Sequence, residues 1–221
     1  MLKKVLVAED IDSINQAVAI LLNDLGITNV AHSQYCDQAW LMAKKELLNN
    51  NPYDLLICDL SFKQDYREEK ITSGEELISK LKNENPNLKV IVHSIEDHPQ
   101  IVKNLWASGN IDAYVCKDRH GIKYLKQAIL ALNKALTYNS PSIEKALSQN
   151  NLISLNTFEI SIVEFLSKGY TQDKIEKVLK EKKIKPNSKS AIEKRLKELR
   201  DEFGAETNPH LVGIMKDLKL I

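Results

Sequence analysis

Five short apolar runs in the first part of the chain alternate with stretches whose apolar residues recur at helical spacing. The runs are Val5–Ala8, Val30–His32, Leu55–Cys58, Val90–His93 and Ala113–Cys116. Runs of this length are typical of buried strands, and the stretches between them are long enough for the helical crossovers that parallel strands require. The alternation therefore predicts an α/β fold with a doubly wound, five-stranded parallel sheet.

Polar and charged side chains stand at the carboxyl ends of four of these runs. They are Glu9, Asp10, Asp59, Ser94 and Lys117. Because open α/β sheets place their ligands at the carboxyl ends of the strands, we expect these side chains to lie close together. Taken alone, Asp59 is more typical of a turn or a helix cap, and Lys117 of a solvated loop.

Three carboxylates in one pocket repel one another, and a divalent cation removes the cost of ionising all three. Oxygen ligands at an open site favour Mg²⁺, which keeps several waters and recruits phosphate oxygens. One carboxylate can then attack a phosphoryl group and become an aspartyl phosphate. We expect Lys117 to neutralise charge on that group, and the Ser94 hydroxyl to form a hydrogen bond with one of its oxygens.

Together with a tyrosine, these side chains resemble the receiver domain of bacterial two-component response regulators, over residues 1–136. The matching positions, in chain order, are Glu9, Asp10, Asp59, Ser94, Tyr114 and Lys117. The resemblance implies a flavodoxin-like fold, Asp59 as the phospho-acceptor and a sensor histidine kinase as the phosphodonor. It also implies that Ser94 and Tyr114 form a switch pair that responds to the phosphoryl group.

The same resemblance implies Mg²⁺ as the cofactor and a set of ligands for it. Asp10 and Asp59 would be direct ligands, and the main-chain carbonyl of Ser61 would be a third. Glu9 would bind the ion through a water molecule.

One loop departs from the receiver pattern. Receivers usually carry a glycine eight residues after the acceptor, whereas Gly74 lies fifteen residues after Asp59. We therefore expect the loop 61–73 to be about seven residues longer than usual, and either to cover the site or to bind a partner.

After the receiver-like part, residues 137–152 break the pattern and predict a linker, running into a short helix around residues 143–147. Four short helices are expected in a second, smaller all-α domain over residues 153–221. The expected N-caps of the first three are Asn156, Thr171 and either Asn187 or Ser188, and Gly169 and Gly204 are expected to end the first and third.

The pieces that carry a second resemblance are Leu155 to Glu159, Lys168-Gly169-Tyr170-Thr171, Ile175, Ile192, Phe203-Gly204 and the ending Leu218 to Ile221. With a basic third helix, they resemble the LuxR/NarL-type helix-turn-helix. Residues 168–200 hold 12 Lys+Arg against 5 Asp+Glu, a local excess of +7 that suits a polyanion, although lysine-rich solvated helices are common. The resemblance implies that the third helix enters the major groove. The residues expected to face phosphates or bases are Lys189, Lys194, Arg195 and Lys197. The span from Gly169 to Gly204 is about six residues longer than usual in this family, and the excess lies around residues 182–186.

The two resemblances imply a response regulator in which Mg²⁺-dependent phosphorylation at Asp59 controls DNA binding and transcription, with homodimers forming on phosphorylation. Its expected chemistry is its own phosphorylation and dephosphorylation, not enzymatic turnover of a separate substrate. An alternative is a receiver-containing adaptor whose C-terminal domain binds a protein. A phosphohydrolase of the haloacid-dehalogenase type is a weaker alternative, because such enzymes need a second aspartate where Ser61 stands.

The cysteine pattern and the absence of long apolar runs bear on location. Cys36, Cys58 and Cys116 cannot all pair and have no metal-binding spacing. No apolar run approaches the roughly 20 residues that cross a bilayer, and the N-terminus lacks a signal-peptide pattern. A cytoplasmic protein with no membrane partner is expected.

Overall fold

A computed structural model describes residues 2–63, 66–148, 155–218 and 220–221. The chain divides into two compact units, residues Met1–Asn150 and Asn151–Ile221, and each is considered by itself. Among the described residues, no helix is both long and apolar enough to span a lipid bilayer.

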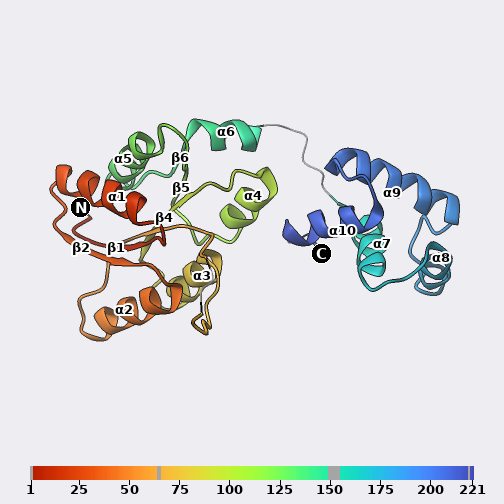
Figure 1. Ribbon diagram of the computed structural model, residues 1–221, viewed down its shortest axis with the longest axis horizontal. Helices are drawn as coiled ribbons and strands as arrows, with labels where there is room; N and C mark the ends of the chain where they lie inside the picture. Colours follow the sequence, from red (N-terminus) through yellow and green to blue (C-terminus); the bar gives the residue numbers. More distant parts are fainter. Residues whose placement is uncertain (1, 64–65, 149–154, 219) are drawn as a thin grey trace. The chain divides into compact units, whose positions relative to one another are not determined.

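The first unit is a parallel sheet with helices on both faces (Figure 1). Its strands are β1 (Lys4–Ala8), β2 (Asn29–Ser33), β3 (Leu55–Cys58), β4 (Lys89–Ser94), β5 (Ala113–Cys116) and β6 (Tyr138–Asn139). They lie in the order β2-β1-β3-β4-β5-β6, and every neighbouring pair is parallel. The connecting helices are α1 (Asp12–Asp24), α2 (Cys36–Leu48), α3 (Gly74–Glu84), α4 (Pro99–Ala107), α5 (Gly121–Leu132) and α6 (Pro141–Ser148).

The strands bury both of their faces, as continuous apolar runs predict. In β1, Val5 and Val7 join one core cluster with α1 and α5, whereas Leu6 and Ala8 join a second cluster with α2, α3 and α4. The predicted doubly wound α/β architecture is confirmed. It places the carboxyl ends of β1, β3, β4 and β5 at one edge of the sheet.

Among the described residues the sheet has six strands, not the predicted five, because part of the expected linker belongs to the first unit. Tyr138 and Asn139 pair with Ala113 and Tyr114 of β5, and the Trp106 indole N–H of α4 donates to Asn139 Oδ1 at 3.0 Å.

Helix α6 continues the first unit beyond β6. It buries Ile143 completely in the core cluster beneath α4, and the amide of Cys116 donates to Ser140 Oγ at 3.1 Å. A two-residue strand is too short to show a period in the sequence, so residues 138–148 were assigned to a linker although they belong to the first unit. The short helix expected around residues 143–147 is present as α6. The predicted linker residues 149–152 and the first two residues of the predicted second domain lie outside the described residues.

The second unit consists of α7 (Thr157–Ser167), α8 (Gln172–Glu181), α9 (Lys189–Phe203) and α10 (Asn208–Asp217). Its caps follow the sequence signals: Asn156 forms a capping box with Glu159, while Thr171 and Ser188 cap α8 and α9. Gly204 ends α9 in the left-handed conformation at φ 65°. The predicted all-α arrangement is confirmed.

Apolar side chains from all four helices form one core. It includes Phe158, Ile162, Ile175, Leu179, Ile192, Leu196, Leu199, Leu211 and Met215. On α9 the buried positions are three or four residues apart, which leaves the opposite face of that helix open to solvent.

Candidate functional site

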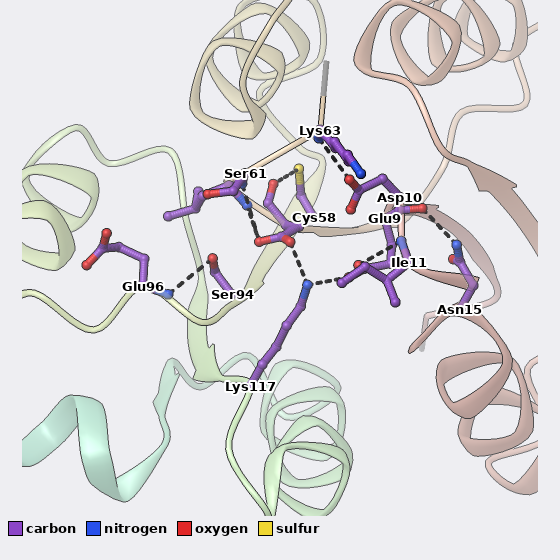
Figure 2. A network of polar contacts seen from close by, with 12 residues as sticks. Glu9, Asp10, Ile11, Asn15, Cys58, Ser61, Lys63, Ser94, Glu96 and Lys117 are labelled. Carbon is purple, nitrogen blue, oxygen red and sulfur yellow. Dashed lines mark hydrogen bonds and ion pairs between the residues drawn. The ribbon is translucent and has the colours of Figure 1, made fainter. Parts of the chain in front are cut away.

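Three acidic side chains and one lysine meet at the carboxyl edge of the sheet (Figure 2). Glu9 and Asp10 follow β1, Asp59 follows β3 and Lys117 follows β5. Ligand atoms of the three carboxylates lie within 4.8 Å of one another. The Lys117 Nζ bridges two of them, at 2.6 Å from Glu9 Oε2 and 2.6 Å from Asp59 Oδ2. The structure thus brings together the charged residues that the sequence predicted to meet.

This charge cluster is largely shielded from water. Glu9 is 2% exposed and Asp59 5%, and the lysine side chain that joins them is 6% exposed. Burial raises the pKa of Glu9, and the hydrogen bond and positive charge of Lys117 oppose that effect only in part. Three ionised carboxylates and one ammonium leave a formal charge of −2. Oxygen donors with uncompensated negative charge can hold a hard divalent cation.

The Asp59 carboxylate is oriented by donors on both of its oxygens. Oδ1 accepts from the amides of Leu60 at 2.6 Å and Ser61 at 3.4 Å, whereas Oδ2 receives the lysine ammonium. The Cys58 thiol donates to the main-chain carbonyl of Asp59 at a sulfur–oxygen distance of 2.9 Å. These contacts fix both the main chain and the side chain of the aspartate.

Gly74, the first residue of α3, packs directly against Asp59 at the end of β3. A Cβ at this position would lie 1.7 Å from the carbonyl oxygen of Asp59 and 2.8 Å from its carbonyl carbon. The Gly74 amide also donates to the Leu60 carbonyl at 3.0 Å. Only glycine allows the helix to approach the aspartate this closely. The longer spacing from Asp59 to Gly74 has therefore not displaced this glycine from the site.

The long loop between β3 and α3 is tied to the site at its ends. Ser61 and Ser73 form an antiparallel bridge, so the loop leaves and returns at one place. Near its start, the Lys63 amide donates to Asp10 Oδ2 at 2.8 Å. This contact was not predicted, because a main-chain donor carries no signal in the residue type.

On its far side the loop is attached to α2. The Asp37 carboxylate accepts from the amides of Lys70 at 2.8 Å and Ile71 at 3.1 Å, and Ile71 is buried in the core. The guanidinium of Arg67 lies 4.2 Å from the centre of the Tyr35 ring. The described part of the loop therefore spans from the acidic site to the N-terminal end of α2.

Ser94 and Tyr114 are linked through Glu96. Ser94 is fully buried, and its Oγ accepts from the Glu96 amide at 3.4 Å. The Tyr114 hydroxyl donates to the Glu96 carbonyl at 2.8 Å, and burial raises the pKa of that hydroxyl, which keeps it protonated. The Glu96 carboxylate accepts from the His98 amide at the start of α4 at 2.8 Å. These hydrogen bonds connect Ser94, Tyr114 and the start of α4.

In the second unit, the predicted DNA-facing residues differ in their surroundings. Lys194 and Lys197 are exposed on α9, and Lys189 forms an exposed ion pair with Asp173 at 2.7 Å. Arg195 does not fit the prediction. The partners of its guanidinium are Glu159, Glu198 and Glu202, at 2.8–2.9 Å.

The physical reason for this correction lies in Glu159, which is only 5% exposed. Its carboxylate completes the capping box of α7 and needs a cation beside it. Arg195 supplies that cation from α9, and the resulting ion pair links α9 to α7. Sequence spacing alone places Arg195 beside Lys194 and gives no indication of this partner.

The chain matches the family described as "Response regulator receiver domain" over residues 5–129. A comparison with curated proteins gives no significant match.

Among solved structures, two RcsB dimers bound to two parallel DNAs share 21% identity, with a TM-score of 0.69 and coverage of 98% of both chains. RcsB from Salmonella typhimurium shares 22% identity, with a TM-score of 0.71 and coverage of 97% of this chain and 99% of that one. RcsB from Salmonella enterica serovar Typhimurium, bound to promoter rprA with the phosphomimetic BeF3−, shares 21% identity at a TM-score of 0.69 and coverage of 98% and 99%. At these identities the likeness concerns the fold. The receiver match covers more than half of the chain, which therefore belongs to the response regulator receiver domain family.

Proposed function

We propose that this protein is a two-component response regulator in which phosphorylation of Asp59 controls DNA binding by the second unit, and thereby transcription. The observation that carries the proposal is the lysine bridge: Lys117 Nζ lies 2.6 Å from Asp59 Oδ2 and 2.6 Å from Glu9 Oε2. A buried aspartate beside a fixed cation is arranged to accept a phosphoryl group and to neutralise its charge.

The chemistry follows from the donors around the aspartate. A carboxylate oxygen of Asp59 forms a bond to phosphorus while the bond from phosphorus to the donor breaks, and the electron pair leaves with the donor, a histidine nitrogen of a sensor kinase or an acyl oxygen. The Leu60 amide and the Lys117 ammonium, both 2.6 Å from the carboxylate, hold it in position. We expect Lys117 and the Ser94 hydroxyl to contact the transferred oxygens.

The residues fit Mg²⁺ as the cofactor. Asp10 and Asp59 would bind it directly with the Ser61 carbonyl, and Glu9 through water, which offsets the net negative charge of the cluster. When bound, the ion supplies positive charge beside the phosphoryl oxygens. The Lys63 amide donates a hydrogen bond to Asp10 Oδ2 and so holds that carboxylate in place.

Phosphorylation would act through the path from Ser94 to α4. The added charge draws the Ser94 hydroxyl, and the hydrogen bonds of Glu96 carry the shift to Tyr114 and to the N-terminal end of α4. We propose that this favours homodimers, in which two second units bind DNA together and gain affinity through effective concentration. A sensor histidine kinase and DNA as partners also imply a cytoplasmic location.

Two observations support DNA over a protein as the partner of the second unit. The similar RcsB structures include complexes with DNA, and α9 exposes Lys194 and Lys197 on the face opposite the core. An adaptor role would leave these lysines without a polyanion to contact.

The test of the acceptor is the variant Asp59→Asn, which keeps the shape of the side chain and removes its nucleophilic charge. Acetyl phosphate with Mg²⁺ should label the unaltered protein and leave the variant unlabelled. Labelling of the variant would place the acceptor elsewhere. In a mobility-shift assay with genomic fragments, DNA binding should rise on phosphorylation and fall steeply with salt; binding that does not depend on salt would favour the adaptor.

A further inference from the structure

The turn between α8 and α9 is longer than a helix-turn-helix needs. It occupies residues 182–188, whereas about three or four residues commonly join the two helices of this motif. The turn is nevertheless ordered at its start by a Schellman motif. The Ile184 amide donates to the Leu179 carbonyl at 3.0 Å, and the Lys183 amide donates to the Lys180 carbonyl at 3.1 Å. Ile184 packs against the core of the unit, which fixes the turn in place.

A lysine occupies the position in this motif that favours glycine. Lys183 has φ 56°, in the left-handed region, which is unfavourable for a residue with a Cβ. The ends of α7 and α9 in the same unit use Gly169 and Gly204 for this conformation. Residues held in an unfavourable backbone region often serve a function that offsets the cost. A glycine at position 183 would adopt this conformation without strain, but it would have no charged side chain.

The turn also holds positive charge that nothing in the described parts of the chain neutralises. Lys183 and Lys185 are exposed and form no ion pair with a described residue. Their neighbours Lys180 and Lys189, by contrast, are paired with Glu176 and Asp173 at 2.7 Å each. Because Ile184 between them is anchored in the core, the two lysines are presented to solvent from a fixed main chain.

We propose that this turn is a second DNA-contacting element, in which Lys183 and Lys185 bind phosphate oxygens of the DNA backbone beside the groove entered by α9. The turn leads directly into the N-terminal end of α9, the end of a recognition helix that meets the base edges. Lysines act on phosphates as point charges and carry no base preference. They supply the positive charge that Arg195, held by three glutamates, does not.

This inference rests on the proposed DNA binding, and one titration separates the two. The full-length phosphorylated chain is titrated into a fluorescently labelled duplex of mixed sequence, about 30 base pairs long, between about 50 and 200 mM KCl. The variants are Lys183→Gln, Lys185→Gln and Lys183→Gly. The control is Lys216→Gln, which removes an exposed charge from α10 of the same unit.

Each turn variant should weaken binding several-fold and reduce the slope of log K against log salt by about 0.9, the value for one lost phosphate contact. Lys183→Gly should also raise the melting temperature, because glycine relieves the left-handed conformation, so that its weaker binding cannot come from unfolding. The control should leave the slope unchanged.

Three outcomes overturn the inference, and they are distinguishable. Unchanged slopes in all turn variants, with normal binding by the unaltered chain, would remove the turn from the interface and leave the proposed function intact. An equal loss of DNA affinity and salt slope in Lys216→Gln would show that the effect comes from net charge and not from the position of the turn lysines. No salt-dependent binding by the unaltered chain would overturn the proposed function together with the turn.

Discussion

The variant Gly74→Ala tests whether the close approach of α3 to the acceptor strand sets the geometry of the site. The added Cβ would lie 1.7 Å from the Asp59 carbonyl oxygen, and contacts under 3.0 Å essentially never occur. The helix and the strand must therefore move apart by roughly 1.3 Å. Both contacting atoms belong to the main chain, so no side chain can rotate away to make room.

Two magnitudes follow from that displacement. Overpacking of this kind costs about 1–3 kcal/mol of stability. A misplacement of about 1 Å in a reacting group lowers rates by about 10²-fold, so labelling of Asp59 by acetyl phosphate should fall by that order. The assay is the initial rate of labelling at saturating Mg²⁺, measured beside a urea unfolding curve.

Gly109→Ala is the matched control in the same unit. Gly109 also needs glycine, at φ 69°, but a Cβ there would have no neighbour within 4 Å. It should lose about 1 kcal/mol of stability and label at the normal rate. Labelling of Gly74→Ala at the rate of the unaltered protein would refute the reasoning, because it would mean that the acceptor tolerates the displacement.

Two further predictions concern buried ionisable side chains. Burial lowers the pKa of His93 to about 4, below its ordinary value of 6.5. The unfolded chain therefore takes up the proton first, and the stability contributed by neutral His93 is present above pH 6.5 and lost as the pH falls toward 4. As the pH falls between these values, the free energy of unfolding of the unaltered protein should decrease by up to about 1.4 kcal/mol per pH unit more than that of His93→Asn, measured by urea unfolding. Parallel pH profiles of the unfolding free energy in the two proteins would contradict the burial argument. Arg195→Met should leave Glu159 without its cation and cost the second unit on the order of 2 kcal/mol, with the salt slope of DNA binding unchanged. A slope that drops by about 0.9 would instead return Arg195 to the DNA interface.

The sheet and its site could be predicted because strand-length apolar runs and the polar residues that end them are both local features of the sequence. Glu9, Asp59 and Lys117 each follow a run, and parallel pairing brings the ends of runs together. The helix caps at Asn156 and Thr171 were predicted for the same reason, since a cap and its partner are three residues apart.

The features that the sequence analysis missed depend on partners far along the chain. Strand β6 is defined only by its pairing with β5, and the Lys63 amide shows its role only when it meets Asp10, 53 residues away. Arg195 was assigned to DNA because its partner on α7, Glu159, is 36 residues away and cannot be identified from helical periodicity.

The bridge between Ser61 and Ser73 separates the length of the β3–α3 loop from the architecture of the acceptor. Since the loop closes on itself before α3 begins, residues can be gained or lost between the two serines while Gly74 stays in register with Asp59. The number of residues between Asp59 and Gly74 can therefore change during evolution. The loop can differ in length and sequence without altering the carboxylate cluster at the edge of the sheet.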